Sequence, residues 1–502
     1  MPTDHTQRLW TLSLAAALLL GVGLRVGALG SGFRTDDYVH LAMLEGRFAI
    51  ERAPWDLYWF SGRDAPETVA LIDSGYLPWW THEDHRVAML RPLSSLLIAL
   101  DHALFDRNAV AYHVHSLLWL VGLLLATGAL LRRILPVGVA ALALVLYALD
   151  EAHGVPSAWI ANRSTLVATT FGVLALSAHL RARERGPTGG WLGPLWLALC
   201  LGAGEYGLCM AAYLLAYEMF GRTEALGARL RALVPAATLC LGYLGARAAL
   251  GHGARASGFY LSPLDSPLEW LSRSLPRMAA LAGDLTLALP AAHWHAGAPL
   301  RAELLSLGLF DPPTWRRLPD WHTWQAAAGA LGIALAALAL RWLARRDPEQ
   351  RRTRLWLAIG SLGALLVPAG SLPGSRLLAA GALGASILIA SLLWLGFQRM
   401  RELTPARRVL PAALLIALVL AHGLNSGQHA LARAGAHRAR AEAERTQAAR
   451  APLPASGHAL LVSASDFATA AHLPVIRQAK APSASLLRLS GGLLPHDILR
   501  AG

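Results

Sequence analysis

Two adjacent carboxylates, Asp36 and Asp37, stand in the stretch GFRTDDYVHLAML, a few residues after a long apolar N-terminal run. Carboxylates at the depth of a membrane surface are costly to desolvate and usually have a functional role. One acid of such a pair can act as a general base while its neighbour tunes it or binds a cation. Adjacent residues diverge on a helix, so we expect only one of the two to face a reaction. The alternative is an ordinary acidic loop.

Arginines nearby have the chemistry to hold an anion. Arg86 and Arg91 lie in HRVAMLRPL, where Pro92 is suited to begin a helix. A guanidinium fixed at such a helix start suits bidentate phosphate binding. The alternative is an arginine that snorkels to the lipid headgroups.

Three further segments supply polar side chains where apolar runs end. YALDEAHGVPSAWIANRSTLV contains His153 and Arg163, GAGEYG places Glu205 in a tight turn, and GSLPGSRLL places Arg376 after a proline–glycine turn. Capping and loop solvation are the alternative for each segment. Whether Asp36 and Asp37 hold a divalent cation, as carboxylate oxygens can, is left open.

The composition is that of a membrane protein. Of the 502 residues, 55% are hydrophobic and 15% are charged, and the mean hydropathy is +0.41. Soluble domains carry about 25% charged residues. The three cysteines lie in apolar segments without metal or redox spacing. The sequence has no GxxxxGK[ST], HExxH, GxSxG or CxxC pattern, so nucleotide hydrolysis is not expected in this chain.

The net charge of +13 orients the protein and does not indicate nucleic-acid binding. Arginines cluster in short gaps between apolar runs, which is the positive-inside pattern. The clusters are Arg132–Arg133, Arg181 to Arg185, Arg222 to Arg231, Arg341 to Arg354 and Arg399 to Arg408. Residues 31–90 instead hold ten acids and five arginines, so we expect them outside.

The hydropathy pattern predicts an all-α integral membrane protein with about eleven transmembrane helices. The predicted spans are 9–30, 110–131, 135–151, 163–181, 190–204, 206–221, 229–250, 322–342, 355–371, 376–398 and 409–425. Two large outer loops, 31–109 and 251–321, interrupt the series, and we expect interfacial helices in them at 91–106 and 267–289. Residues 1–425 would form the membrane domain. Residues 426–502 would form a small outer α/β domain with a helix at 429–450 and a strand at 459–467.

These motifs, in this order, resemble the GT-C superfamily of polytopic glycosyltransferases. The similarity is greatest to the tetratricopeptide-type protein O-mannosyltransferases and their repeat-free bacterial relatives. It runs from about residue 30 to 220, with a weaker match near 371–378. TDDYVHL is similar to the family's acidic pair, and RPL with FDRNAVAYHVHSLL is similar to its RPL…YH..N..lH stretch. GEYG resembles its KE.G turn, and LPGSRLL its arginine region.

The segment YALDEAHGVPSAWIANRSTL resembles the family's FAvHPiHtEaV…gRaelL, with His153 and Arg163 in register. Three positions depart from the pattern: Ser116 replaces asparagine, Val155 replaces glutamate and Gly204 replaces lysine. The family's repeats are absent, and the tail after residue 425 has no counterpart.

The resemblance implies an inverting transferase that moves a sugar from a polyprenyl-phosphate donor to a protein or glycan acceptor. Asp36 or Asp37 would be the base. The lipid phosphate would contact Arg86, Arg91, Arg163 and Arg376, with His153 and Glu205 as secondary residues. We expect a multi-pass protein of the bacterial inner membrane whose site faces the periplasm or exterior. Two rival functions are a polyprenyl-lipid transporter or flippase, and a non-catalytic assembly protein of envelope glycan synthesis.

Overall fold

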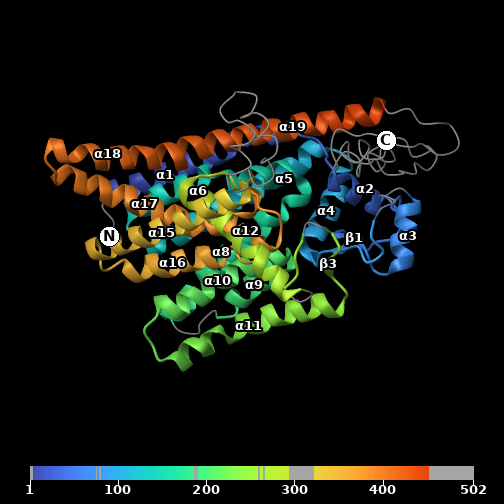
Figure 1. Ribbon diagram of the computed structural model, residues 1–502, viewed down its shortest axis with the longest axis horizontal. Helices are drawn as coiled ribbons and strands as arrows, with labels where there is room; N and C mark the ends of the chain where they lie inside the picture. The colour runs from blue at the N-terminus through green and yellow to red at the C-terminus, as the bar shows by residue number, and fades with distance from the viewer. Residues whose placement is uncertain are drawn as a thin grey trace, which may run out of the picture.

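The computed structural model is a bundle of long helices with a smaller layer of short elements at one end (Figure 1). The structure describes residues 4–74, 76–77, 81–185, 190–257, 260–263, 266–292 and 321–450. Within these residues, eight helices are long and apolar enough to cross a membrane. The number is nine if the bent pair Val137–Leu149 and Glu151–Ala158 is one span. The prediction of an all-α integral membrane fold is confirmed.

The long helices enclose an apolar core. They are α1 (Asp4–Gly23), α5 (Ala109–Ile134), α6 (Val137–Leu149), α8 (Ser164–Arg185), α11 (Leu226–Ala249), α15 (Trp321–Arg346), α16 (Arg351–Gly363), α17 (Ala379–Glu402) and α18 (Pro405–Val419). Helices α1 and α17 pack on α6, α8 packs on α5, and α16 packs on α17. Fully buried leucines such as Leu120, Leu144 and Leu176 fill the space between them. Because these segments are apolar on most faces, they suit a lipid environment outside the core.

Two of the eleven predicted spans are shorter than a membrane crossing. The segment 190–204 forms α9 (Leu192–Gly202), and 206–221 forms α10 (Leu208–Ala216) with the π-helix η5 (Tyr217–Gly221). At 1.5 Å per residue, the 11 residues of α9 extend about 16 Å, which is about half of the hydrocarbon thickness. The turn between the two helices is the 3-10 helix η4 (Glu205–Gly207). Helix α9 alone is therefore too short to cross a membrane, and the turn that carries Glu205 lies between α9 and α10.

The first outer loop folds into short elements around a core of its own. They are α2 (Asp36–Leu44), β1 (Trp59–Ser61), α3 (Ala65–Asp73), β2 (Arg86–Ala88) and α4 (Pro92–Phe105). Buried Tyr58, Tyr112 and Ile160 belong to this second core, so the loop packs directly on the membrane helices. The predicted helix at 91–106 is present as α4, and the predicted helix at 267–289 is present as α12 (Pro267–Leu287).

A three-stranded antiparallel sheet joins the two outer loops, which the sequence did not predict. Strand β3 (Gly253–Arg255) of the second loop pairs with β2, which also pairs with β1. Val87 lies opposite Ala254 in the β2–β3 pair. Each strand has three residues, too few for an alternating pattern to be visible in the sequence.

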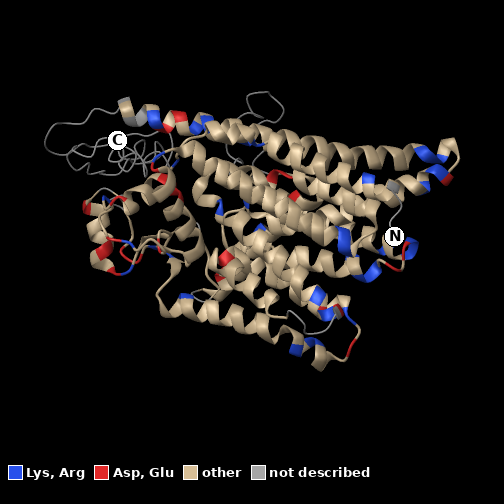
Figure 2. Cartoon of the chain, turned by 180° about the vertical axis from the view of Figure 1, so that it is seen from behind, with Lys and Arg blue, Asp and Glu red and all other residues tan. Residues whose placement is uncertain are grey.

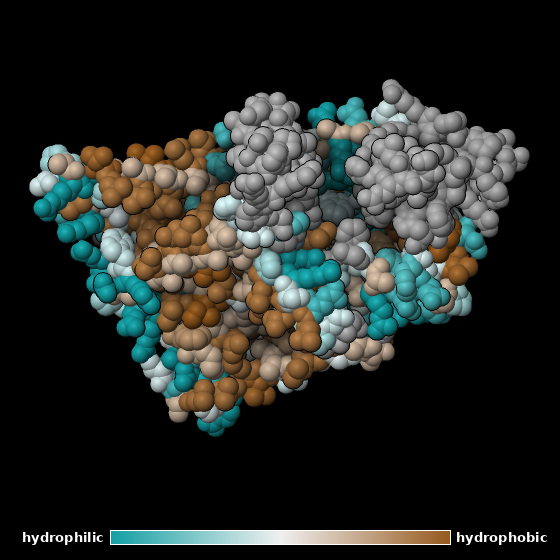
Figure 3. All heavy atoms as spheres, viewed as in Figure 1, coloured by the Kyte–Doolittle hydropathy of each residue, from teal (hydrophilic) through white to brown (hydrophobic). Residues whose placement is uncertain are grey.

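The two ends of the bundle differ in charge. Lys and Arg gather at the end opposite the first outer loop, whereas acidic residues are frequent in that loop (Figure 2). Apolar side chains cover the flank between the two ends on the face shown in Figure 3. This distribution agrees with the orientation predicted from the arginine clusters.

The helix that begins at α18 does not stop at the predicted domain boundary. It continues through the π-helix η9 (Leu420–Asn425) into α19 (Ser426–Arg450), which covers the predicted helix at 429–450. Helix α19 lies against the 3-10 helix η1 (Val26–Gly30) and the short helix α7 (Gly154–Ala158). The predicted strand at 459–467 lies outside the described residues.

Candidate functional site

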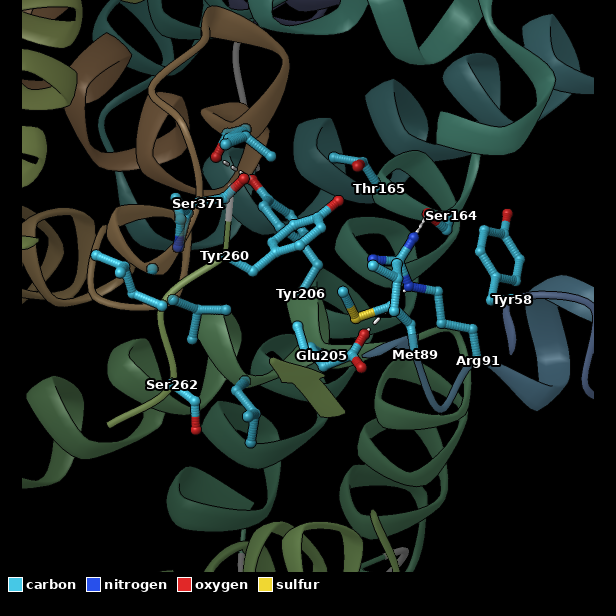
Figure 4. A pocket seen from close by; sticks show the side chains of 18 of the residues that line it. Tyr58, Met89, Arg91, Ser164, Thr165, Glu205, Tyr206, Tyr260, Ser262 and Ser371 are labelled. Atoms are coloured by element: carbon cyan, nitrogen blue, oxygen red, sulfur yellow. Dashed lines mark hydrogen bonds and ion pairs between the residues drawn. The ribbon is translucent and has the colours of Figure 1, made fainter. Parts of the chain in front are cut away.

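A cavity of about 430 Å³ lies where the two outer loops meet the membrane helices. Its wall combines charged and aromatic side chains with an apolar side (Figure 4). The charged residues of the wall are Asp36, Arg91, Glu205, Arg247 and Arg376. The aromatic residues are Tyr58, Phe60, Trp159, Tyr206, Tyr260 and Trp270. Residues from seven separate segments of the chain therefore line one cavity.

The two adjacent aspartates have different surroundings. Asp36, the first residue of α2, lines the cavity. Asp37 is 2% exposed; its Oδ1 accepts a hydrogen bond from the Ala161 backbone N–H at 2.8 Å, and its Oδ2 accepts one from the Arg34 N–H at 3.0 Å. Burial raises the pKa of Asp37 to about 7. Asp37 thus connects α2 to the segment that contains Ala161, and Asp36 is the carboxylate that lines the cavity.

Arg91 and Glu205 form an ion pair on the cavity wall. The Arg91 Nε lies 3.1 Å from Glu205 Oε2 (Figure 4). The Leu90 N–H donates to Glu205 Oε1 at 3.2 Å. Arg247 approaches the same carboxylate, with Nε 3.6 Å from Glu205 Oε1. Glu205 thereby holds two guanidiniums side by side, an arrangement that suits a multivalent anion.

Gly204 explains how Arg91 reaches this position. Gly204 has φ +138°, and a Cβ added there would lie 2.7 Å from Arg91 Cγ. Arg91 therefore passes directly over the glycine backbone, in space that any other residue at 204 would occupy. Its guanidinium carbon also lies 4.8 Å from the centroid of the Tyr58 ring, within the range of a cation–π contact.

Arg376 occupies another part of the wall. It belongs to the 3-10 helix η8 (Ser375–Leu377), and its guanidinium carbon lies 5.8 Å from the centroid of the Trp159 ring. The guanidinium carbon of Arg34 lies 5.7 Å from the same ring. Trp159 is therefore fixed by two cations, and one of them lines the cavity.

Three of the residues singled out in the sequence lie away from the cavity wall. Arg86 donates from Nε to the Gly62 carbonyl at 2.7 Å and from Nη1 to the Gly251 carbonyl at 3.3 Å. These bonds tie β2 to its neighbouring loops. The cavity therefore does not include Arg86.

The other two are buried among the membrane helices. Arg163 is 2% exposed, and its Nη2 lies 2.6 Å from Asp101 Oδ2. His153 is fully buried, and its Nε2 lies 3.0 Å from the Tyr147 carbonyl. Each of these side chains is engaged by a protein partner behind the wall.

Sequence reasoning missed Arg247 and the aromatic wall. Arg247 falls near the outer end of the predicted span 229–250, where it counts as part of an apolar run. The only signal was a single cation at the outer end of a span, against the positive-inside rule. Tyr260 and Trp270 come from the second outer loop, and only the fold brings them to this cavity.

The described residues contain no group of three or more His, Cys, Asp and Glu side chains that could hold a metal ion. Both Asp37 oxygens accept backbone hydrogen bonds. A divalent cation at Asp36 and Asp37 stays a prediction, and in it Asp36 would be the carboxylate at the cavity.

The cavity can support acid–base chemistry next to an anion site. Three guanidiniums and two carboxylates line it, which leaves an excess of one positive charge. Glu205 pairs with two of these guanidiniums, and Asp36 supplies the second carboxylate of the wall. A carboxylate of the wall could therefore act as a base, and its guanidiniums could stabilise the charge of a leaving anion.

Comparison with known proteins gives matches among solved structures. The chain is similar to the Archaeoglobus fulgidus oligosaccharyltransferase tethered with an acceptor peptide, with 14% identity and a TM-score of 0.48 over 93% of this chain and 63% of that chain. It is also similar to AglB from the same organism in complex with an inhibitory peptide and a dolichol-phosphate, with 13% identity and a TM-score of 0.49 over 97% of this chain and 65% of that chain.

A further match is ArnT from Cupriavidus metallidurans bound to undecaprenyl phosphate, with 13% identity and a TM-score of 0.47 over 93% of this chain and 84% of that chain. The chain spans less than two thirds of the length of the archaeal oligosaccharyltransferase chains that it matches. No family model and no curated protein matches the sequence.

Proposed function

We propose that this chain transfers a sugar from a polyprenyl-phosphate donor to a hydroxyl group of a protein or glycan acceptor. The observation that carries the proposal is that Asp36 shares one cavity with Arg91, Arg247 and Arg376. A transfer of this kind needs a base for the acceptor and fixed positive charge for the departing phosphate, and both are present in this space.

In the proposed reaction Asp36 takes the proton of the acceptor hydroxyl. The acceptor oxygen then forms a bond with the anomeric carbon of the sugar while the bond between that carbon and the phosphate oxygen breaks. Attack from the face opposite the phosphate inverts the anomeric configuration. The electron pair of the broken bond stays on the phosphate, and Arg91, Arg247 and Arg376 stabilise the charge that it gains.

The apolar side of the cavity suits the isoprenoid part of such a donor. It is lined by Leu208, Leu244, Leu366 and Val367. Leu244 and Leu366 are 39% and 48% exposed, so the lining continues onto the outer surface of the bundle. A lipid-linked donor can thus place its phosphate at the arginines while its chain remains among apolar side chains.

We place the site on the non-cytosolic side of a bacterial inner membrane, because the arginine clusters mark the opposite end as cytosolic. A lipid-linked donor supplies activated sugar on a side of the membrane that lacks nucleotide sugars. The carboxylate of Asp36 supplies the base for this reaction.

The test is a mass comparison of surface glycans, glycoproteins and polyprenyl-linked sugars in cells with and without the gene. We expect loss of one sugar unit from an acceptor and accumulation of the corresponding polyprenyl-phosphate sugar. A transporter of the lipid would instead change which side of the membrane holds the lipid-linked sugar. Unchanged glycans together with unchanged lipid-linked sugars would refute the proposal.

A further inference from the structure

Helix α19 contacts three segments near the cavity, and two of them directly precede a residue of the cavity wall. The segments are residues 34–35, Glu151 and Ser375. Thr35 directly precedes Asp36, and Ser375 directly precedes Arg376. Helix α19 therefore contacts the residues that directly precede the proposed base, Asp36, and one of the proposed phosphate partners, Arg376.

Glu444 of α19 holds the segment before Asp36. Its Oε2 accepts a hydrogen bond from the Thr35 N–H at 3.3 Å, and its Oε1 lies 3.8 Å from the Nε of Arg34. The Glu444 side chain is 2% exposed. His437, two turns earlier on α19, also contacts the guanidinium of Arg34. A buried carboxylate with these partners fixes the backbone at the start of α2.

The backbone that Glu444 holds is strained. Thr35 has φ +35°, in the left-handed region that β-branched residues avoid. Such a conformation persists only where the surrounding structure determines it. The contacts that do so are the Glu444 bond to the Thr35 N–H and the Asp37 bond to the Arg34 N–H. The direction in which Asp36 leaves the first turn of α2 depends on this conformation.

Arg433 of α19 holds the segment before Arg376. Its Nε lies 3.1 Å from Glu151 Oε2, and its Nη2 lies 3.4 Å from Ser375 Oγ. The Ser375 hydroxyl also contacts the carboxylates of Glu151 and Asp284, the latter at 2.8 Å. Arg433 offsets the charge of this buried carboxylate pair, which would otherwise be costly to keep around one hydroxyl group.

We propose that α19 is a clamp that positions the site, with Glu444 as the positioning residue for Asp36 and Arg433 as the positioning residue for Arg376. Neither side chain is part of the cavity wall. Glu444 acts through the backbone N–H of Thr35, and Arg433 acts through the hydroxyl of Ser375; each of these groups directly precedes a wall residue. The clamp follows from contacts alone, and only its effect on sugar transfer rests on the proposed function.

The test uses the full-length purified protein with Glu444→Gln, Arg433→Gln, Arg433→Lys and the control Glu442→Gln, an exposed carboxylate on the same helix. Hydrogen–deuterium exchange is measured in peptides that cover residues 30–40 and 371–378. We expect Glu444→Gln to speed exchange only in 30–40, and Arg433→Gln only in 371–378. The expected change is roughly tenfold, as for loss of one charge-assisted hydrogen bond. The exchange rates of Arg433→Lys, which keeps the charge, should be nearer to those of the wild-type protein. The exchange rates of Glu442→Gln should equal those of the wild-type protein.

The second readout is the affinity for undecaprenyl phosphate. Arg433→Gln should weaken binding, whereas Glu444→Gln should leave binding unchanged and lower transfer in cells. The proposal would be overturned if Glu444→Gln and Arg433→Gln each sped exchange equally in both peptides. It would also be overturned if both variants exchanged at the wild-type rate. If the wild-type protein does not bind undecaprenyl phosphate, the proposed function fails, while the exchange data still decide whether the clamp exists.

Discussion

Asp37 accepts a hydrogen bond from the Ala161 backbone N–H at 2.8 Å, across 124 residues of sequence. This bond fastens the first outer loop to the start of the span that contains α8. It also separates the roles of two neighbouring aspartates, because it occupies Asp37 behind the wall while Asp36 lines the cavity.

Asp37→Asn should change the pH dependence of stability. An aspartate in the unfolded chain has a pKa near 3.9, and burial raises the pKa of Asp37 in the folded protein to about 7. Between these values the folded state binds more protons, so the free energy of unfolding falls as the pH rises from about 4 to about 7. Asn removes this titration while its amide oxygen can still accept one backbone hydrogen bond.

The measurement is thermal unfolding of the detergent-purified protein at several pH values. The wild-type protein and the exposed-site control Glu83→Gln should lose stability across this interval more steeply than Asp37→Asn. Parallel curves for all three proteins would contradict the assignment of a buried, titrating carboxyl to Asp37.

Gly204→Ala should disturb the anion site without unfolding the bundle. A Cβ at this position would lie 2.7 Å from Arg91 Cγ, and the backbone has φ +138°. Arg91 would have to move away from Glu205, so we expect undecaprenyl phosphate to bind about tenfold more weakly, which corresponds to ~1.4 kcal/mol. The matched control is Gly242→Ala on α11, where a Cβ meets nothing within 4 Å. Equal affinity of the two variants would count against the site.

Arg163→Met should cost stability because it removes the guanidinium partner of the buried Asp101 carboxylate, which then keeps only its contact with the His115 ring. The Arg163 Nη2 lies 2.6 Å from Asp101 Oδ2, and both side chains are at most 2% exposed. Breaking such a pair costs about 3–5 kcal/mol, whereas replacing both partners by apolar residues costs much less. The double variant Asp101→Leu/Arg163→Met should therefore be more stable than Arg163→Met, and the exposed-site control Arg181→Met should match wild type. A double variant less stable than Arg163→Met would contradict this prediction.

The orientation can be tested by labelling single cysteines with a membrane-impermeant maleimide. Glu83→Cys in the first outer loop should react in intact cells, and Glu349→Cys in the turn between α15 and α16 should react only after permeabilisation. Both positions are exposed. The background is Cys240→Ala, because the other two cysteines are buried. The reverse pattern would invert the topology and place the cavity on the cytosolic side.

Much of the fold could be predicted because long apolar runs leave few alternatives. The spans around α5 and α17 follow from length and composition, and α4 follows from Pro92 after Arg91. The sequence does not distinguish the short helices α9 and α10 from full spans, because hydropathy reports apolar composition and not where a helix begins and ends. The sheet was missed because three-residue strands carry no periodicity.

The site could be predicted in part. One cavity is lined by four of the residues that the sequence singles out by type and position: Asp36, Arg91, Glu205 and Arg376. The sequence does not show which of Asp36 and Asp37 faces the cavity, because this depends on the backbone amides that each carboxylate meets in the fold. The prediction that Arg163 contacts the phosphate rests on its motif, and the sequence does not show that its ion-pair partner is Asp101, 62 residues away.

The most direct measurement is complementation of cells that lack the gene with Asp36→Asn, followed by mass analysis of the sugar-bearing acceptor. We predict that the variant reaches the membrane at normal abundance and still binds undecaprenyl phosphate, yet leaves the acceptor without its sugar, while Asp37→Asn restores at least part of it. Full restoration of the sugar by Asp36→Asn would contradict the assignment of Asp36 as the base.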